Sequence, residues 1–176
     1  MTDIILGAAL DHVVAAIAAK FPTYKTVVAE DQTKGKVTVP AILINFVDLE
    51  PAPDADASTD QWPCYVRFEA SIILGLRTPK IHREIAQATA ALAAFIHNNR
   101  LTVPWGAGQV LAAEPDEFAP NADQYHVWRV EWQHQADLGD VIWTADGIAP
   151  TEVLLSFVPA IGNDHEADYI PVVESE

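Results

Sequence analysis

The stretch Cys64–Asn99, with the sequence CYVRFEASIILGLRTPKIHREIAQATAALAAFIHNN, decides the fold because it predicts a strand that runs directly into a helix. Apolar and polar residues alternate from 64 to 76, which predicts a strand with one buried face and one solvent-exposed face. Thr78 and Pro79 then predict a helix start. The apolar stripe of that helix is Ile81, Ile85, Ala88, Leu92 and Phe95, with Ile96 beside it. Asn98 suits the helix end, since Asn tolerates the left-handed conformation found there.

An amphipathic helix is predicted at the start of the chain. Its apolar residues recur at helical spacing, and the pattern ends near Phe21-Pro22. Thr2 or Asp3 is the expected cap. The stripe consists of Leu6, Leu10, Val13 and Ile17. No basic residue precedes this run, and Asp11 interrupts it, so it predicts neither a signal peptide nor a membrane segment.

Three further strands are predicted at residues 37–49, 109–113 and 125–138. The first is apolar on both faces, which indicates a strand covered on both sides, by the chain's own helices and by another subunit. One of its faces carries Ile42, Ile44 and Phe46, and the other carries Val39, Leu43, Val47 and Leu49. The last strand alternates cleanly, with His126, Trp128, Val130, Trp132, His134 and Ala136 on one face.

The predicted class is therefore α+β, with the order α-β-β-α-β-β and an irregular C-terminal extension. A strand, helix, strand passage normally makes a right-handed crossover between parallel strands, so we expect a mixed sheet of about four strands with both helices on one face. The acidic loop tips near Asp56 and Asp116 then lie at opposite ends of the sheet. The other sheet face carries charges of both signs, from Arg67, Glu69, Arg129 and Glu131.

The chain divides into residues 1–139, an α+β domain, and residues 140–176, an extension or arm. The arm consists of short apolar pieces separated by Gly, Pro and acidic residues, without a sustained period. Such a segment either wraps its own domain or lies on a neighbour, and the pattern leaves both open.

Charge and cysteine content narrow the classes of function. The chain of 176 residues has a formal charge of −15, from 25 acidic and 10 basic residues, which disfavours any grip on nucleic acid phosphates. The negative charge is compatible with a protein surface along which DNA passes without binding. Cys64 is the single cysteine, so no disulfide forms within the chain.

The loop 50–63 is rich in Pro, Ala, Asp, Ser and Thr, and Trp62 is its only large apolar anchor. Its acidic residues include Asp54 and Asp56. A solvated hairpin loop is the more common role of such a segment. The alternative is that the loop becomes ordered against a partner.

The sequence contains only weak motifs for catalysis or metal binding. The cluster Asn163–Asp168 has the spacing of neither a helical zinc site nor a calcium loop, so a solvated acidic turn is expected. Cys64 has no positive neighbour in sequence to activate it. His126 and His134 are too far apart along one strand to share an ion, and we expect them at the edge of the core with hydrogen-bond partners. We therefore predict no catalytic residue, no metal ligand and no cofactor, and a protein that is not an enzyme.

The chain resembles the tail terminator and tail-completion proteins of long-tailed bacteriophages over about residues 2–138. The residues that carry the likeness are the first helix, Pro40-Ala41-Ile42-Leu43-Ile44, the strand Val66–Leu76 with the helix Ile81–Ile96, and the strand Val127–Gln135. The likeness is one of arrangement rather than of an invariant motif, so no functional residue is carried over from the family.

This resemblance implies a virion protein, assembled in the host cytoplasm, that forms a ring of about six subunits at the head-proximal end of the tail. Its expected partners are further copies of itself, the tail tube protein and the head-side connector or stopper, with DNA passing through the lumen and no membrane contact. The candidate interface residues are Ile42, Ile44, Phe46, Asp54, Asp56, Trp62, Arg67, Glu69, Arg129, Glu131, Leu154 and Phe157. The alternatives are another neck or adaptor protein of the same virion and a small ligand-binding or enzymatic α+β domain with a pocket under its helices.

Overall fold

The structure is a computed structural model that describes residues 4–30, 37–53, 55, 59–116, 125–142 and 153–172. The chain forms two compact units, Met1–Ile142 and Trp143–Glu176. The predicted boundary falls after residue 139. We call the first unit the α+β domain and the second unit the arm, and each is described by itself. Among the described residues, no helix is both long and apolar enough to cross a membrane.

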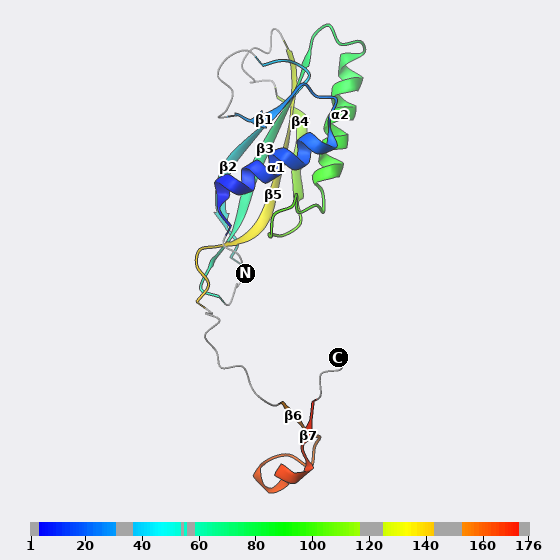
Figure 1. Cartoon of the computed structure of the whole chain (residues 1–176). Helices are drawn as coiled ribbons and strands as arrows, with labels where there is room; N and C mark the ends of the chain where they lie inside the picture. The colour runs from blue at the N-terminus through cyan, green and yellow to red at the C-terminus, as the bar shows by residue number, and fades with distance from the viewer. Residues whose placement is uncertain are drawn as a thin grey trace. The chain divides into compact units, whose positions relative to one another are not determined.

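The α+β domain contains one mixed sheet of five strands in the order β1-β2-β3-β5-β4 (Figure 1). Only β1 and β2 are parallel neighbours, and the other pairs are antiparallel. The strands are β1 Thr26–Ala29, β2 Ala41–Pro51, β3 Trp62–Gly75, β4 Gln109–Pro115 and β5 Tyr125–Leu138. The predicted α+β class and mixed sheet are confirmed. The count of about four strands missed β1, because this edge strand has only four residues and is flanked by polar residues.

The predicted parallel direction of the two strands on either side of α2 is also confirmed. Strands β3 and β4 both run antiparallel to β5, which lies between them, so they are parallel to each other. Trp62 at the start of β3 pairs with Leu138, whereas Pro115 at the end of β4 pairs with Trp128. The loop before β3 and the loop after β4 therefore begin at opposite ends of the sheet. Asp56 itself lies outside the described residues.

The two helices are α1, Leu6–Lys20, and α2, Ile81–Ile96, and Figure 1 shows α1 crossing the strands. Their starts differ from the prediction. The N-cap of α1 is Ile5, and that of α2 is Lys80 in a left-handed conformation, neither with a side-chain cap. Thr78 donates its backbone N–H to Gly75 O, so Thr78-Pro79 forms the turn before α2 rather than its first residues. Asn98 has φ 58, as its position at the helix end predicts.

Both helices pack on the face of the sheet that carries Phe68 and Trp132, as predicted. Val13 and Ile17 of α1 and Ile85 of α2 are fully buried in this core. Phe68 stacks on Trp132 with ring centroids 5.5 Å apart. Each such side chain contributes roughly 1.5–3 kcal/mol when it is buried, so this single layer between helices and sheet stabilises the domain.

Strand β2 departs from the predicted alternation because its register shifts between Phe46 and Asp48. Val47 at this bulge is 45% exposed, whereas Phe46 and Leu49 both pack against the core. A bulge adds one residue to one strand and so reverses the faces that follow it. Placing Leu49 on the face opposite Phe46 was therefore wrong. Ile42 is correctly placed, but it is fully buried beneath the chain's own helices.

Candidate assembly surfaces

The sheet face that points away from the helices carries two ion-pair clusters, which together we call the charged face. In the first, Arg67 Nη2 donates to Glu50 Oε2 at 2.8 Å. Arg67 Nε lies 3.8 Å from Asp48 Oδ1, which satisfies an ion pair but is too long for a hydrogen bond. Both atoms are buried, so this side of the arginine is held by charge alone.

The second cluster centres on Arg129. Its guanidinium donates to Glu114 Oε1, with Nη2 at 2.7 Å and Nε at 3.2 Å. The same side chain lies 3.6 Å from Glu69 and 3.4 Å from Glu131. Glu69 and Glu131 face each other across β3 and β5, where two like charges are unfavourable without the arginine. Arg129 therefore bridges a carboxylate pair that the sheet register forces together.

Titration of this cluster follows from its geometry. Burial raises the pKa of Glu69, Arg129 opposes that shift, and Glu131 adds to it. The hydrogen bond that Arg129 donates to Glu114 is the main reason that the pKa of Arg129 is raised. The four residues predicted for this surface, Arg67, Glu69, Arg129 and Glu131, thus do lie on one face, and carboxylates outnumber arginines there.

The other predicted interface residues are placed as follows. Ile42 and Ile44 are 1% and 0% exposed, so they belong to the chain's own core and are removed from the candidate interface. The reason is that helices α1 and α2 already cover their face. Phe46 is half-buried at the edge of the same core. Asp54 and Asp56 lie outside the described residues.

The base of the loop 50–63 is held by Gln61, which the sequence pattern did not single out. Gln61 is buried, and its Nε2 donates to Gly139 O at 2.7 Å. Thr59 Oγ1 donates to Gln61 Oε1 at 3.0 Å, and Ile142 N donates to Thr59 O at 3.0 Å. Trp62, expected to be the anchor, is 43% exposed. It is instead an aromatic side chain open to contact at the end of the sheet.

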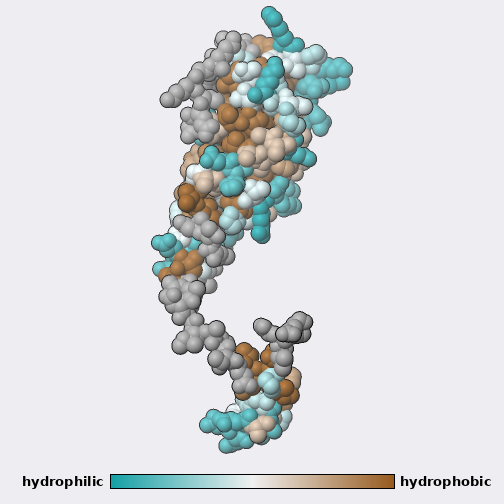
Figure 2. Space-filling model, viewed as in Figure 1, coloured by the Kyte–Doolittle hydropathy of each residue, from teal (hydrophilic) through white to brown (hydrophobic). Residues whose placement is uncertain are grey.

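The arm exposes its apolar side chains. In its described part, two short antiparallel strands of two residues each pair with each other, β6 Leu154–Leu155 and β7 Ile170–Pro171. The connection between them contains a 3₁₀ helix, η2 Asn163–Asp168. None of residues 153–172 is buried. Leu154 is 47% exposed and Phe157 is 69% exposed, and Figure 2 shows apolar side chains on the surface of this unit. Folded units normally bury many such residues, but the described residues of this unit leave these side chains exposed.

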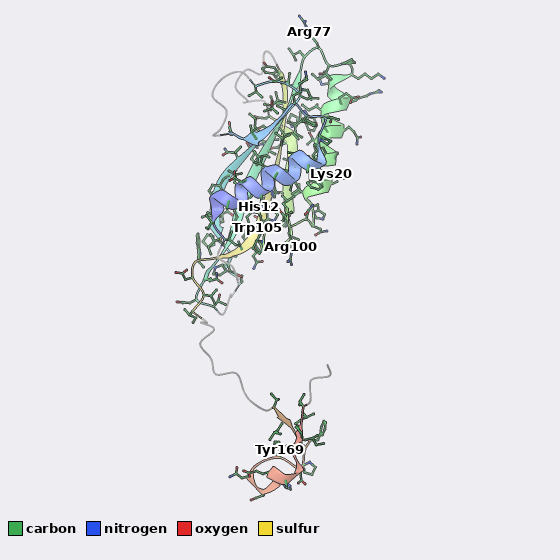
Figure 3. The ribbon with its side chains drawn as sticks, in the orientation of Figure 1. His12, Lys20, Arg77, Arg100, Trp105 and Tyr169 are labelled. Carbon is green, nitrogen blue, oxygen red and sulfur yellow. The ribbon has the colours of Figure 1, made fainter. Side chains whose placement is uncertain are left out.

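The arm is stabilised instead by polar contacts within its turn. Gly162 N donates to the hydroxyl of Tyr169 at 3.0 Å, and Figure 3 labels Tyr169 in the arm. His165 Nδ1 lies 2.9 Å from Asp168 Oδ2. No three possible metal ligands gather anywhere in the described parts of the chain. The cluster Asn163–Asp168 is thus an acidic turn closed by its own side chains.

The remaining candidate groups for chemistry lie in or near the core. Cys64 is fully buried, and burial, followed by the charge of Asp137, raises the pKa of its thiol. His126 contacts His82 of α2, with ring centroids 4.6 Å apart.

His134 is fully buried, where the sequence placed it at the core edge. Its Nε2 accepts from Trp132 Nε1 at 3.1 Å, so Nδ1 is the protonated nitrogen and donates to Gly106 O at 2.9 Å. The ring also stacks on Trp105 at 4.4 Å. Burial lowers the pKa of His134, which therefore stays neutral.

The structure also contains an open cavity that the sequence did not predict. This α2 crevice has a volume of about 550 Å³ and lies between the start of α2, the end of β3 and the segment before β2. Leu74, Pro40 and Ala88 supply apolar walls, whereas Arg77 and Glu84 are charged lining residues. Segments far apart in sequence form it, so no local motif could have indicated it.

These features define a class: an α+β domain with helices on one sheet face, charges on the other, and an arm with exposed apolar side chains. No protein-family model matches the chain, and no curated protein matches it.

Proposed function

We propose that this chain is a structural protein of the tail terminator kind, which forms a ring at the head-proximal end of a phage tail. The ring ends polymerisation of the tail tube and joins the tail to the head-side connector or stopper. One observation carries the proposal: none of the arm's described residues is buried, although Leu154, Phe157 and Val158 are large and apolar. Exposed apolar surface of this kind is typical of an interaction site, and in this proposal a neighbouring chain covers it.

The α+β domain supports the same function. Its helices occupy one sheet face, and the charged face remains available on the other. A closed ring requires two different patches on each subunit that fit each other head to tail. The arm and a surface of the domain can provide such a pair, and a net charge of −15 keeps DNA from adhering to a lumen wall.

The decisive experiment adds the full-length chain to tail tubes during their polymerisation and examines the products by negative-stain microscopy. We expect a ring at one end of each tube and shorter tubes than without the chain. Phe157→Asp should reduce end decoration, whereas Phe157→Leu should preserve it because the apolar contact is retained. Tubes that grow to the same length with bare ends would refute the proposal.

Two alternatives predict different products. Another neck or adaptor protein of the same virion would bind the connector but leave tube ends bare. The α2 crevice favours the second alternative, a small-molecule-binding domain, because it is the kind of open cavity that a ligand could fill. In that case the chain would remain a monomer, and a ligand would raise its unfolding temperature without any assembly on tubes.

A further inference from the structure

Gln61 connects two segments that are far apart in the sequence, the loop 50–63 and the end of β5. Strands β3 and β5 lie side by side, and Trp62 with Leu138 is the last residue pair at this end of their ladder (Figure 1). Beyond this pair, the side-chain amide of Gln61 replaces the backbone as the group that bonds across the two segments. Its Nε2 donates to Gly139 O at 2.7 Å. The contact between the two strands is thus extended past the end of the sheet.

A second contact joins the loop to the last residue before the arm. Thr59 Oγ1 donates to Gln61 Oε1 at 3.0 Å, and Thr59 O accepts from the backbone N–H of Ile142 at 3.0 Å. Ile142 is the final residue of the α+β domain, and the arm begins at the next residue. We call residues 139–142 the arm root, and we call the three hydrogen bonds among Thr59, Gln61, Gly139 and Ile142 the clasp.

Polar contacts rather than packing hold the arm root. The side chain of Ile142 is 57% exposed, so burial contributes little to keeping this residue in place. Gln61 is only 8% exposed. If one of its two bonds opens, a desolvated donor or acceptor is left without a partner, which is unfavourable. The bonds of the clasp therefore open and close together.

The backbone on both sides of the clasp adopts special conformations. Asp60, between Thr59 and Gln61, has φ 65, and Gly139 has φ 102. Asp tolerates the left-handed region, and glycine adopts it without steric cost. Such conformations persist where the surrounding contacts determine them, and they often accompany function. Their presence on both sides of one contact indicates that the clasp is a specified feature of the fold.

We propose that Gln61 couples the loop 50–63 to the arm root, so that a partner that holds either segment also stabilises the other. A contact that favours the closed clasp at one segment favours the same closed state at the other, and this effect is reciprocal. The consequence for assembly rests on the proposed ring, in which a neighbouring copy holds the arm. Contact with that neighbour then stabilises the base of the loop.

The test measures hydrogen exchange of individual amides by NMR in the full-length chain. Gln61→Leu removes the donor and the acceptor at similar size. We expect the Ile142 amide to exchange about tenfold faster, although its own acceptor, Thr59 O, is unchanged. The amide of Asp116, which donates to Val127 O at the opposite end of the sheet, should change by less than about twofold. An Ile142 amide that is unprotected in the parent chain, or that responds no more than Asp116 does, would overturn the inference.

Matched variants separate the clasp from general effects of substitution. Gln109→Leu makes the same change at an exposed glutamine of β4, whose Oε1 accepts from Gln133 Nε2. It should leave the exchange rate of Ile142 within about twofold of the parent value. Thr59→Val removes the hydroxyl that bonds Gln61 and should raise this rate about fivefold, whereas Thr59→Ser keeps the hydroxyl and should not. Equal effects of the two Thr59 variants would contradict the role of the clasp.

Tail tubes extend the test to the assembled state, where hydrogen exchange is followed by mass spectrometry. In the parent chain, peptides from the loop 50–63 and from the arm root should become protected together on binding. In Gln61→Leu the two segments should no longer respond together, and joint protection that persists unchanged would overturn the inference. A chain that never binds tubes would refute the tail terminator proposal, whereas the exchange rates of the free chain would still decide the coupling.

Discussion

The α+β domain and the arm differ in the exposure of their large apolar side chains. In the domain, Trp132, Phe68 and Ile17 are no more than 1% exposed in the core between the sheet and the helices. In the arm, Phe157 is 69% exposed, and its hairpin consists of two residues in each strand. A unit of this size has a large surface for its volume, which explains why none of its described residues is buried.

The two regions also use polar groups differently. His134 and Gln61 are buried in the domain with their hydrogen bonds satisfied, which specifies one packing arrangement. In the arm, the bond between Gly162 and Tyr169 shapes a turn but leaves the apolar residues outside. Buried polar groups thus help to fix the packing of the domain, whereas the described apolar side chains of the arm stay exposed.

The largest effect on stability is expected in the core. Trp132→Ala should lower the free energy of unfolding by about 3–5 kcal/mol, because it leaves a cavity against Phe68 and removes the donor to His134. Urea denaturation of the purified chain measures this change. A loss below about 1 kcal/mol would mean that the domain does not depend on the core described above.

A smaller, pH-dependent effect is expected at His134. Its pKa is lowered in the folded state, so the unfolded state binds its proton more readily, and stability falls as the pH drops below about 6.5. His134→Gln should cost about 1–3 kcal/mol at pH 7.5, because a buried bond is lost.

The same variant should show a flatter loss of stability between pH 7 and about 5, since glutamine does not titrate. Denaturation series across this range measure both slopes. Parallel slopes for the variant and the parent chain would exclude His134 as the group responsible.

A still smaller effect is expected on the charged face. The pKa of Glu69 is raised, so its ionised form is disfavoured in the fold, and stability from this group is lost as the pH rises through its folded pKa. Glu69→Gln should stabilise the chain at pH 7 by no more than about 0.5 kcal/mol, because the site is partly exposed. Thermal unfolding of both proteins at pH 7 and at low pH gives the comparison, and the difference should vanish in acid.

No effect on stability is expected in the arm. Phe157→Asp should leave the free energy of unfolding of the dilute chain unchanged within about 0.5 kcal/mol, because the side chain is not buried. The same variant should lose assembly on tail tubes. A large drop in stability without any change in assembly would contradict this prediction, because it would show that Phe157 stabilises the fold and does not form an assembly contact.

Local periodicity predicted much of the architecture. The alternation in β3 and β5 and the helical spacing in α2 identified the buried faces correctly, since each face follows from the repeat of its own backbone. The shared location of Arg67, Glu69, Arg129 and Glu131 followed from the same rule. Ile42 and Ile44 were assigned to an interface because a strand with two apolar faces does not reveal which cover is the chain's own.

The sequence by itself determined the strand and helix repeats, the parallel direction of the strands on either side of α2 and the acidic, apolar character of the arm. Only the tertiary structure decided the bulge at Val47, the edge strand β1, the anchoring role of Gln61 and the α2 crevice. The physical reason is the distance along the chain between the residues that interact. A repeat depends on neighbours along the chain, whereas a register shift, a buried amide or a crevice depends on segments that meet only after folding.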